Sequence, residues 1–158
     1  MTVMTPRMLE RKFIDRAGRM VNTQPERDFQ AFVDAHSLPY KMNEARQFMA
    51  RDRRGVLRTF NFQLDFVEFA DPEVFREWKV TGFVRSDARV KTDFEVDGKG
   101  HKDSSDPWKD AAKNAAGVKV VHIPSFMCRR RMWTGLLESL RTALRQPELT
   151  VYLDGYGR

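Results

Sequence analysis

Residues 90–97 have the sequence VKTDFEVD, and GKGH follows directly at 98–101. The alternation predicts a β-strand with one apolar and one acidic face, because successive side chains point to opposite sides of a sheet. The acidic face comprises Asp93, Glu95 and Asp97. Three carboxylates at this spacing repel one another unless a cation, protonation or full solvation offsets their charge. The two interpretations are a site for a hard divalent cation and an exposed edge strand kept soluble by charge.

The chain after this strand predicts a helix at 108–116 that ends at Gly117, then a short apolar strand at 118–123 that Pro124 ends. A strand, a helix and a strand in succession form a right-handed crossover, in which the two strands are parallel. The sequence therefore predicts parallel pairing between the acidic strand and the strand at 118–123.

A second alternating stretch, at 57–69, precedes the acidic strand and predicts another half-buried strand. Its apolar face would carry Phe60, Phe62, Leu64 and Phe66, and its polar face Asn61, Gln63 and Asp65. If the two strands are neighbours, Asp65 reaches the carboxylates of the acidic strand. The arginine-rich segment at 51–55 predicts a turn before this strand, either solvated or in contact with phosphates.

The remaining elements follow from capping and periodicity. Thr23 and Glu26 form a capping box with Pro25 in the first turn, which predicts a helix that ends before Pro39. Further helices are predicted at 6–20, 71–78 and 127–146, a strand at 79–85, and a disordered tail or an edge strand at 147–158. The fold class is therefore α/β, with a mixed sheet flanked by helices in one domain spanning residues 1–158.

The composition favours a polyanionic partner. The chain has 158 residues with 28 Lys and Arg against 22 Asp and Glu, a net charge of +6, and a pI near 9.7. Nucleic acid or an acidic membrane surface would suit this charge. We expect an intracellular protein without membrane insertion, because there is one cysteine, no leader and no long apolar stretch.

Other chemistries have little support in the sequence. There is no Walker loop, dinucleotide glycine fingerprint or serine elbow, so nucleotide-triphosphate hydrolysis and serine catalysis are not expected. Cys128 is interpreted as a buried structural thiol. The histidines at 36, 101 and 122 lack the spacing of a zinc site, and His122 is interpreted as an internal histidine of a core strand.

Carboxylates beside lysines predict phosphodiester chemistry. Gly98 and Gly100 permit close approach of the backbone to a ligand. Lys99, Lys109 and Lys113 add positive charge near the acidic strand. Metal-dependent phosphodiester hydrolysis needs this combination, because the cation activates water while a lysine or arginine stabilises the charge of the transition state.

The order of these motifs resembles the very-short-patch-repair-like endonucleases of the restriction-endonuclease-like PD-(D/E)xK superfamily. The resemblance covers residues 24–123, and EVDGKGH at 95–101 is its most specific part. The matching motifs are Pro25-Glu26, Leu64-Asp65-Phe66, Glu95 to Gly98 with His101, Asp110 with Lys113, and Gly117 before the strand 120–123.

The resemblance implies a restriction-endonuclease-like nuclease core at 24–123, and the predicted basic N-terminal helix within 1–22 precedes it. It implies that Asp65 and Glu95 are metal-binding carboxylates, that Asp97 is an additional acidic residue of the site, that His101 positions or deprotonates water and that Glu26 is an outer member. We predict that Asp65, Glu95 and Asp97 hold Mg²⁺ or Mn²⁺ and that Lys99 completes the catalytic set by stabilising the developing charge.

Two departures from the superfamily pattern leave alternatives open. The lysine expected two residues after the glutamate is Asp97 here, so Lys99 or Lys113 would have to supply the cation. The separation between Asp65 and Glu95 is long for this family, which leaves Asp93 as a rival for the role of Asp65.

The resulting prediction is a cytoplasmic or intracellular Mg²⁺-dependent DNA endonuclease, with association with the nucleoid and action in a phage-infected cell as open alternatives. Arginines and lysines would hold the phosphate backbone without sequence recognition; they are Arg51, Arg53, Arg54, Arg58, Lys109, Lys113, Arg129, Arg130 and Arg131. A double-strand cut would need a homodimer or two nicks. The alternatives are an RNA-directed nuclease, a non-catalytic nucleic-acid-binding protein and a protein that docks on an acidic partner.

Overall fold

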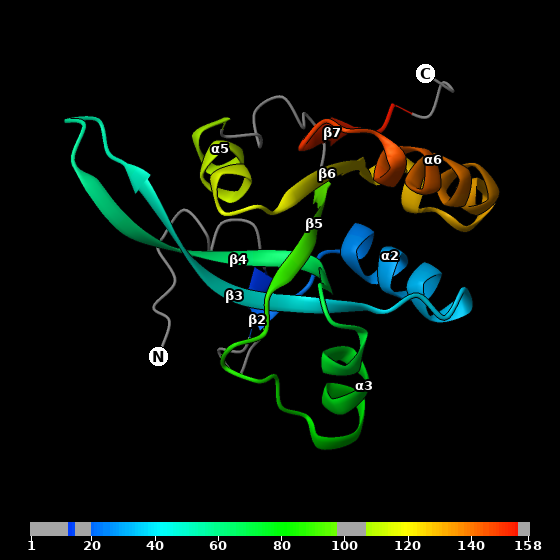
Figure 1. Cartoon of the computed structure of the whole chain (residues 1–158). Helices are drawn as coiled ribbons and strands as arrows, with labels where there is room; N and C mark the ends of the chain where they lie inside the picture. The colour runs from blue at the N-terminus through cyan, green and yellow to red at the C-terminus, as the bar shows by residue number, and fades with distance from the viewer. Residues whose placement is uncertain (1–12, 15–19, 98–106, 155–158) are drawn as a thin grey trace.

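The computed structural model describes residues 13–14, 20–97 and 107–154. Its centre is a five-stranded mixed sheet in the order β3-β4-β5-β6-β7 (Figure 1). The strands are β3 (Tyr40–Arg51), β4 (Leu57–Phe69), β5 (Val90–Asp97), β6 (Lys119–Pro124) and β7 (Thr150–Tyr152). Strand β4 runs antiparallel to β3 and to β5, whereas β6 runs parallel to β5 and to β7. The predicted α/β class with a mixed sheet is confirmed.

In the described part of the chain four α-helices flank this sheet, and two apolar clusters define its two sides. The helices are α2 (Gln24–Ala35), α3 (Pro72–Thr81), α5 (Pro107–Ala115) and α6 (Trp133–Arg145). One cluster joins α2 and α6 to Phe94 and Val96 of β5. The other joins Val74 of α3 and Ala112 of α5 to β4. None of the helices within the described ranges is long and apolar enough to cross a membrane.

Strand β5 is the central strand of the sheet. It pairs with β4 from Phe69↔Val90 to Phe66↔Phe94 and with β6 along Thr92 to Asp97. The interpretation of this segment as an exposed edge strand is therefore wrong. The predicted parallel pairing with the strand after Gly117 is confirmed, because α5 carries the chain back across the sheet.

Capping explains why the predicted helices form where they do. The side chain of Thr23 accepts a hydrogen bond from the Glu26 amide, and Pro25 occupies the first turn of α2. Asp71 caps α3 in the same way. At the C-terminus of α3, Gly82 has a φ of +78°, a left-handed conformation that glycine adopts without strain. Helix α3 thus occupies part of the segment predicted as a strand at 79–85, and that prediction is wrong.

Two further helix predictions need correction. Phe13–Ile14 (β1) and Met20–Val21 (β2) form a short antiparallel pair, so the helix predicted at 6–20 is wrong at these positions. The helix predicted from 127 begins only at Trp133. Two 3₁₀ turns, η1 (Ser125–Cys128) and η2 (Arg130–Met132), precede it, because Arg129 is extended and interrupts helical geometry. Of the two alternatives for the C-terminal segment, the edge strand is confirmed as β7.

Strand β3 was absent from the sequence prediction. It pairs with β4 from Tyr40↔Glu68 to Arg51↔Leu57. The turn predicted at 51–55 joins the two strands, and residues 52–56 form the connection. The sequence of β3 shows no clean alternation of apolar and polar residues, because much of this long hairpin is exposed. The strand is stabilised instead by its cross-strand pairing with β4.

The single apolar face predicted for the strand at 57–69 is also wrong. Phe62 and Leu64 belong to the cluster with α5, whereas Phe66 belongs to the cluster with α2. The change occurs at Asp65, which lies across from Asn43 between the pairs Met42↔Phe66 and Glu44↔Leu64. Asn43 has a φ of +61°, and this left-handed residue interrupts the regular pleat beside Asp65.

Candidate functional site

Six acidic side chains are buried in the described part of the chain: Glu26, Asp65, Asp93, Glu95, Asp97 and Asp110. Burial of a carboxylate is unfavourable unless a charged or hydrogen-bonding partner compensates it. Two buried basic side chains, Lys113 and His122, provide such partners. We call Asp65, Asp93, Glu95 and Lys113 the lysine group, and Asp97, Asp110 and His122 the histidine group.

Asp65 and Glu95 connect β4 and β5 just beyond the point where their regular pairing ends, at Phe66↔Phe94. The amide of Asp65 donates to Glu95 Oε2 at 3.1 Å, and the amide of Val96 donates to Asp65 Oδ2 at 2.9 Å. Side-chain carboxylates thus accept bonds from the backbone of the opposite strand. The fold therefore brings together two carboxylates that lie 30 residues apart in the sequence.

Lys113 reaches this site from α5. Its Nζ lies 2.8 Å from Asp93 Oδ2 and 3.9 Å from Glu95 Oε1, and the residue is only 4% exposed. Burial alone lowers the pKa of Lys113, but the negative charges of Asp93 and Glu95 outweigh burial and raise it above its ordinary value. Lys113 is therefore a fixed, buried cation next to Glu95.

Asp93 is the least solvated member of the lysine group. Burial, and then the charge of Glu95, raise the pKa of Asp93 well above its ordinary value, while Lys113 opposes the shift. Its Oδ1 finds no hydrogen-bond partner among the residues that the structure describes. Asp93 therefore pairs with Lys113, whereas Asp65 bonds across to the strand of Glu95.

The histidine group lies next along β5. His122 of β6 places Nδ1 at 3.1 Å from Asp97 Oδ2 and Nε2 at 2.7 Å from Asp110 Oδ2. Burial lowers the pKa of His122, but the bonds to Asp110 and Asp97 raise it overall to about 10. The ring also stacks on Tyr152 of β7, with centroids 4.4 Å apart. His122 is therefore an imidazolium that links β5, α5, β6 and β7.

His122 was predicted only as an internal histidine, without its two acidic partners Asp97 and Asp110. The internal position is confirmed, but the partners are carboxylates of the resemblance motif. One feature of the sequence could have indicated charged groups on the buried side of this helix, because Asp110 and Lys113 are three residues apart and share one face. The pairing itself depends on how α5 packs against the sheet.

The predicted metal-binding trio is only partly brought together. Asp65 and Glu95 are adjacent, but the carboxylate of Asp97 is directed to His122. In the described ranges, no three Asp, Glu, His or Cys side chains are arranged so that they could hold a metal ion. Lys99 and His101 lie outside the described residues.

Glu26 occupies the predicted capping box at the start of α2. Thr23 Oγ1 donates to Glu26 Oε1 at 2.9 Å, and Glu26 is 3% exposed. Its expected role as an outer member of the site stays a prediction. The bond to Thr23 also gives it a structural role.

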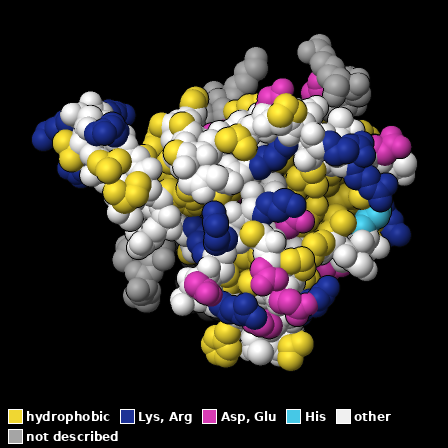
Figure 2. Space-filling view, in the orientation of Figure 1, with side chains coloured by type: hydrophobic (Ala, Val, Ile, Leu, Met, Phe, Trp, Pro, Cys, Tyr) yellow, Lys and Arg dark blue, Asp and Glu magenta, His cyan; other side chains and the backbone are white. Residues whose placement is uncertain are grey.

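The predicted nucleic-acid contacts fall into separate regions. Arg51, Arg53, Arg54 and Arg58 are exposed at the end of the β3–β4 hairpin, where dark-blue side chains gather in Figure 2. Arg129, Arg130 and Arg131 are exposed around η2. Lys109 lies over the rings of Phe62 and Trp108. Lys113 is buried in an ion pair, so its prediction as a surface contact is wrong.

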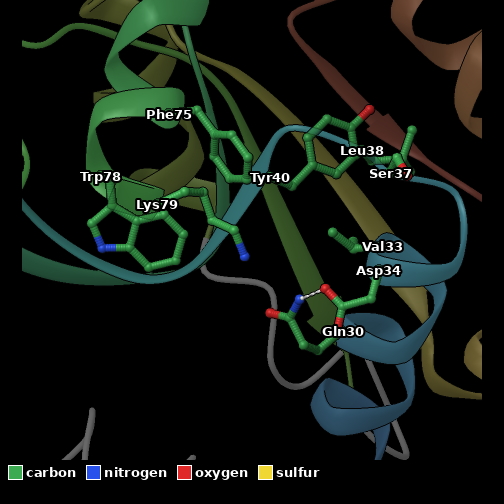
Figure 3. Close-up of a pocket in the computed structure, with 9 residues that line it drawn as sticks. All are labelled: Gln30, Val33, Asp34, Ser37, Leu38, Tyr40, Phe75, Trp78 and Lys79. Atoms are coloured by element: carbon green, nitrogen blue, oxygen red, sulfur yellow. Dashed lines mark hydrogen bonds between the residues drawn. The ribbon is translucent and has the colours of Figure 1, made fainter. Parts of the chain in front are cut away.

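A pocket of about 290 Å³ between α2 and α3 is separate from both groups (Figure 3). Its lining combines apolar and aromatic side chains with polar ones: Val33, Leu38, Tyr40, Phe75 and Trp78 together with Gln30, Asp34, Ser37 and Lys79. It contains no member of the lysine or histidine group, so we do not assign the chemistry of the site to it.

Cys128 should be unreactive in the native protein. It is fully buried, and burial, together with the charge of Asp28, raises the pKa of its thiol to about 12. We expect thiol-specific reagents at pH 8 to modify it at least about 100-fold more slowly than in the urea-unfolded chain. Equal rates in both states would show that the thiol is accessible.

Comparisons with protein-family models, with curated proteins and with solved structures find no match to this chain.

Proposed function

We propose that this protein is a metal-dependent nuclease of the restriction-endonuclease-like type that hydrolyses DNA phosphodiester bonds. The single observation that carries the proposal is the lysine group, in which Lys113 is held against Glu95 beside Asp65. These residues lie where β4 and β5 stop pairing with each other. A buried cation next to two carboxylates suits an anionic substrate that a divalent cation also contacts.

The residues present fit a hard divalent cation by the chemistry of their donors. Asp65 and Glu95 offer carboxylate oxygens, and Mg²⁺ typically uses one or two carboxylates while water and substrate phosphate complete its shell. These two residues would hold Mg²⁺ or Mn²⁺. When bound, the cation would polarise the phosphate and lower the pKa of a coordinated water.

In this proposal, Lys113 takes the role of the lysine that the superfamily places two residues after the glutamate. Asp93 fixes the position of its ammonium group at 2.8 Å. Because the ammonium is buried and already oriented, it would stabilise charge on the phosphate without the cost of reorganising solvent. The carboxylate of Asp97 is bound to His122, so we propose that Asp97 is a positioning residue rather than a ligand of the cation.

The proposal predicts that Glu95→Gln and Asp65→Asn each lower Mg²⁺-dependent nicking of supercoiled plasmid DNA by at least about 100-fold, because each removes one anionic cation ligand. Both substitutions preserve side-chain size. Glu138→Gln, at an exposed position on α6, is the matched control and should cleave like the wild type.

Binding to the same DNA in EDTA separates catalysis from folding, and both variants should bind as the wild type does. Cleavage that is equal in the variants and the wild type would contradict the site. Binding to DNA with no cleavage by the wild-type protein would favour a non-catalytic nucleic-acid-binding protein. Cleavage of RNA alone would change the substrate.

A further inference from the structure

The far end of the β3–β4 hairpin stands clear of the helices as a two-stranded ribbon (Figure 1). We call residues 49–59 the arm. Pairing within it is regular, from Met49↔Thr59 to Arg51↔Leu57. Contacts with α5 lie at the base of the arm, where Trp108 packs against Phe60 at 5.0 Å. Ala50 of the arm packs against the apolar cluster of α3, α5 and β4, whereas residues 51–58 belong to neither cluster and extend beyond the core.

The turn at the end of the arm has a fixed conformation. Asp52 Oδ1 accepts from the amides of Arg54 and Val56, at 2.8 and 3.0 Å. Its other oxygen pairs with Arg58 at 2.8 Å. The Val56 amide bond, together with those from Arg54 and Arg58, lowers the pKa of Asp52 and keeps it ionised. Such a preorganised turn loses little conformational entropy when it binds a partner.

The surface of the arm combines cationic and apolar side chains. The arm contains four arginines and one acidic residue, Asp52. The guanidinium groups of Arg53 and Arg54 form no ion pair or hydrogen bond with the described part of the chain. Three apolar residues are about half exposed, namely Met49 at 52%, Val56 at 51% and Leu57 at 52%. Figure 2 shows the two kinds of side chain intermixed at this end of the molecule.

We propose that the arm inserts into the major groove of B-form DNA. The major groove, about 12 Å wide, admits a two-stranded β-ribbon, whereas the deep and narrow major groove of A-form RNA does not. The arginines would contact phosphates and guanine edges. Val56 and Leu57 would contact apolar groups on the groove floor, such as thymine methyls. The charge of the arm complements the DNA, and its apolar side chains favour a groove over the phosphate backbone alone.

The arm and the lysine group can engage one duplex. Asp65 follows Leu57 by eight residues on β4. At about 3.4 Å per residue this separation is at most about 27 Å, which corresponds to about eight base pairs. This step rests on the proposed function, whereas groove binding by the arm does not.

The test measures binding of the full chain to a 20-base-pair DNA duplex in EDTA by fluorescence anisotropy. We expect Arg53→Ala with Arg54→Ala to weaken binding at least tenfold and to lower the slope of log affinity against log salt by about 2. Val56→Ser with Leu57→Ser should weaken binding several-fold at an unchanged slope. The control removes the same charge from α6, through Arg141→Ala with Arg145→Ala, both at exposed positions.

Insertion of the arm into the major groove is tested with DNA whose cytosines carry glucosylated 5-hydroxymethyl groups, because these groups fill the major groove. Glucosylation should weaken wild-type binding several-fold and leave the Val56→Ser/Leu57→Ser variant almost unaffected. The proposal is overturned if both arm variants bind like the α6 control, if glucosylation weakens wild type and variant equally, or if the arm substitutions weaken binding to duplex RNA as much as to DNA.

Failure of this proposal is distinguishable from failure of the proposed function. Arm-dependent binding in EDTA without Mg²⁺-dependent cleavage would retain the arm and reject the nuclease. Cleavage that requires Glu95, with binding indifferent to the arm, would retain the nuclease and reject the arm.

Discussion

Lys113→Met should abolish the proposed cleavage and lower the free energy of unfolding by about 3–5 kcal/mol. The substitution keeps the length and apolar stem of the side chain but removes the charge that faces Asp93 at 2.8 Å and Glu95 at 3.9 Å. Two carboxylates would then remain buried without their cation. Urea unfolding measures the stability, and plasmid nicking in Mg²⁺ measures the activity.

A second substitution separates the two roles of Lys113. Adding Asp93→Asn to Lys113→Met removes the nearer of the two uncompensated charges, so it should restore part of the stability but not the cleavage. Lys91→Met, at an exposed position on β5, is the control and should alter neither. Wild-type cleavage by Lys113→Met would mean that another group, such as Lys99, supplies the catalytic cation. Cleavage restored together with stability in the double variant would make Lys113 purely structural.

His122→Phe should also destabilise the protein by about 3–5 kcal/mol near neutral pH, because Asp97 and Asp110 would lose their shared partner. The aromatic ring remains available to stack on Tyr152, so the change mainly removes the two charged hydrogen bonds. His36→Phe, at a partly buried position with a bond to a backbone carbonyl, is the control and should cost much less. A stability equal to that of the wild type would show that the two acids do not depend on His122.

The stabilisation by His122 has a defined pH dependence. Its pKa is about 10 in the folded protein against 6.5 for an ordinary histidine. The folded state therefore binds the proton more tightly, and the resulting stabilisation is complete below pH 6.5 and disappears as the pH rises to 10. The shift corresponds to about 5 kcal/mol at most. Urea unfolding between pH 6.5 and 10 should show wild-type stability falling more steeply than that of His122→Phe, and parallel curves would contradict this assignment.

Local rules predicted the elements around the site. The alternation in VKTDFEVD correctly placed Asp93, Glu95 and Asp97 on the face opposite Phe94 and Val96, because the pleat of a strand repeats every two residues. Capping signals at Thr23 and Asp71 located α2 and α3. The short strand–helix–strand unit implied parallel pairing of β5 and β6.

Other elements could not be predicted from local pattern. Strand β3 lacks clean alternation, since its pairing with β4 stabilises it more than burial does. The inversion of faces at Asp65 depends on the left-handed Asn43 on the neighbouring strand. The C-terminal edge strand was one of two alternatives, and only its pairing with β6 decided between them.

For the candidate site, the local pattern of the sequence indicates which carboxylates share the acidic face of β5 and that Lys113 and Asp110 share a face of the next helix. How these charges pair depends on the packing of the folded chain. Asp93 and Glu95 pair with Lys113, and Asp97 and Asp110 pair with His122. The two differ because side-chain direction follows from the local backbone period. The choice of partner for a buried charge depends on which elements pack together when water is excluded.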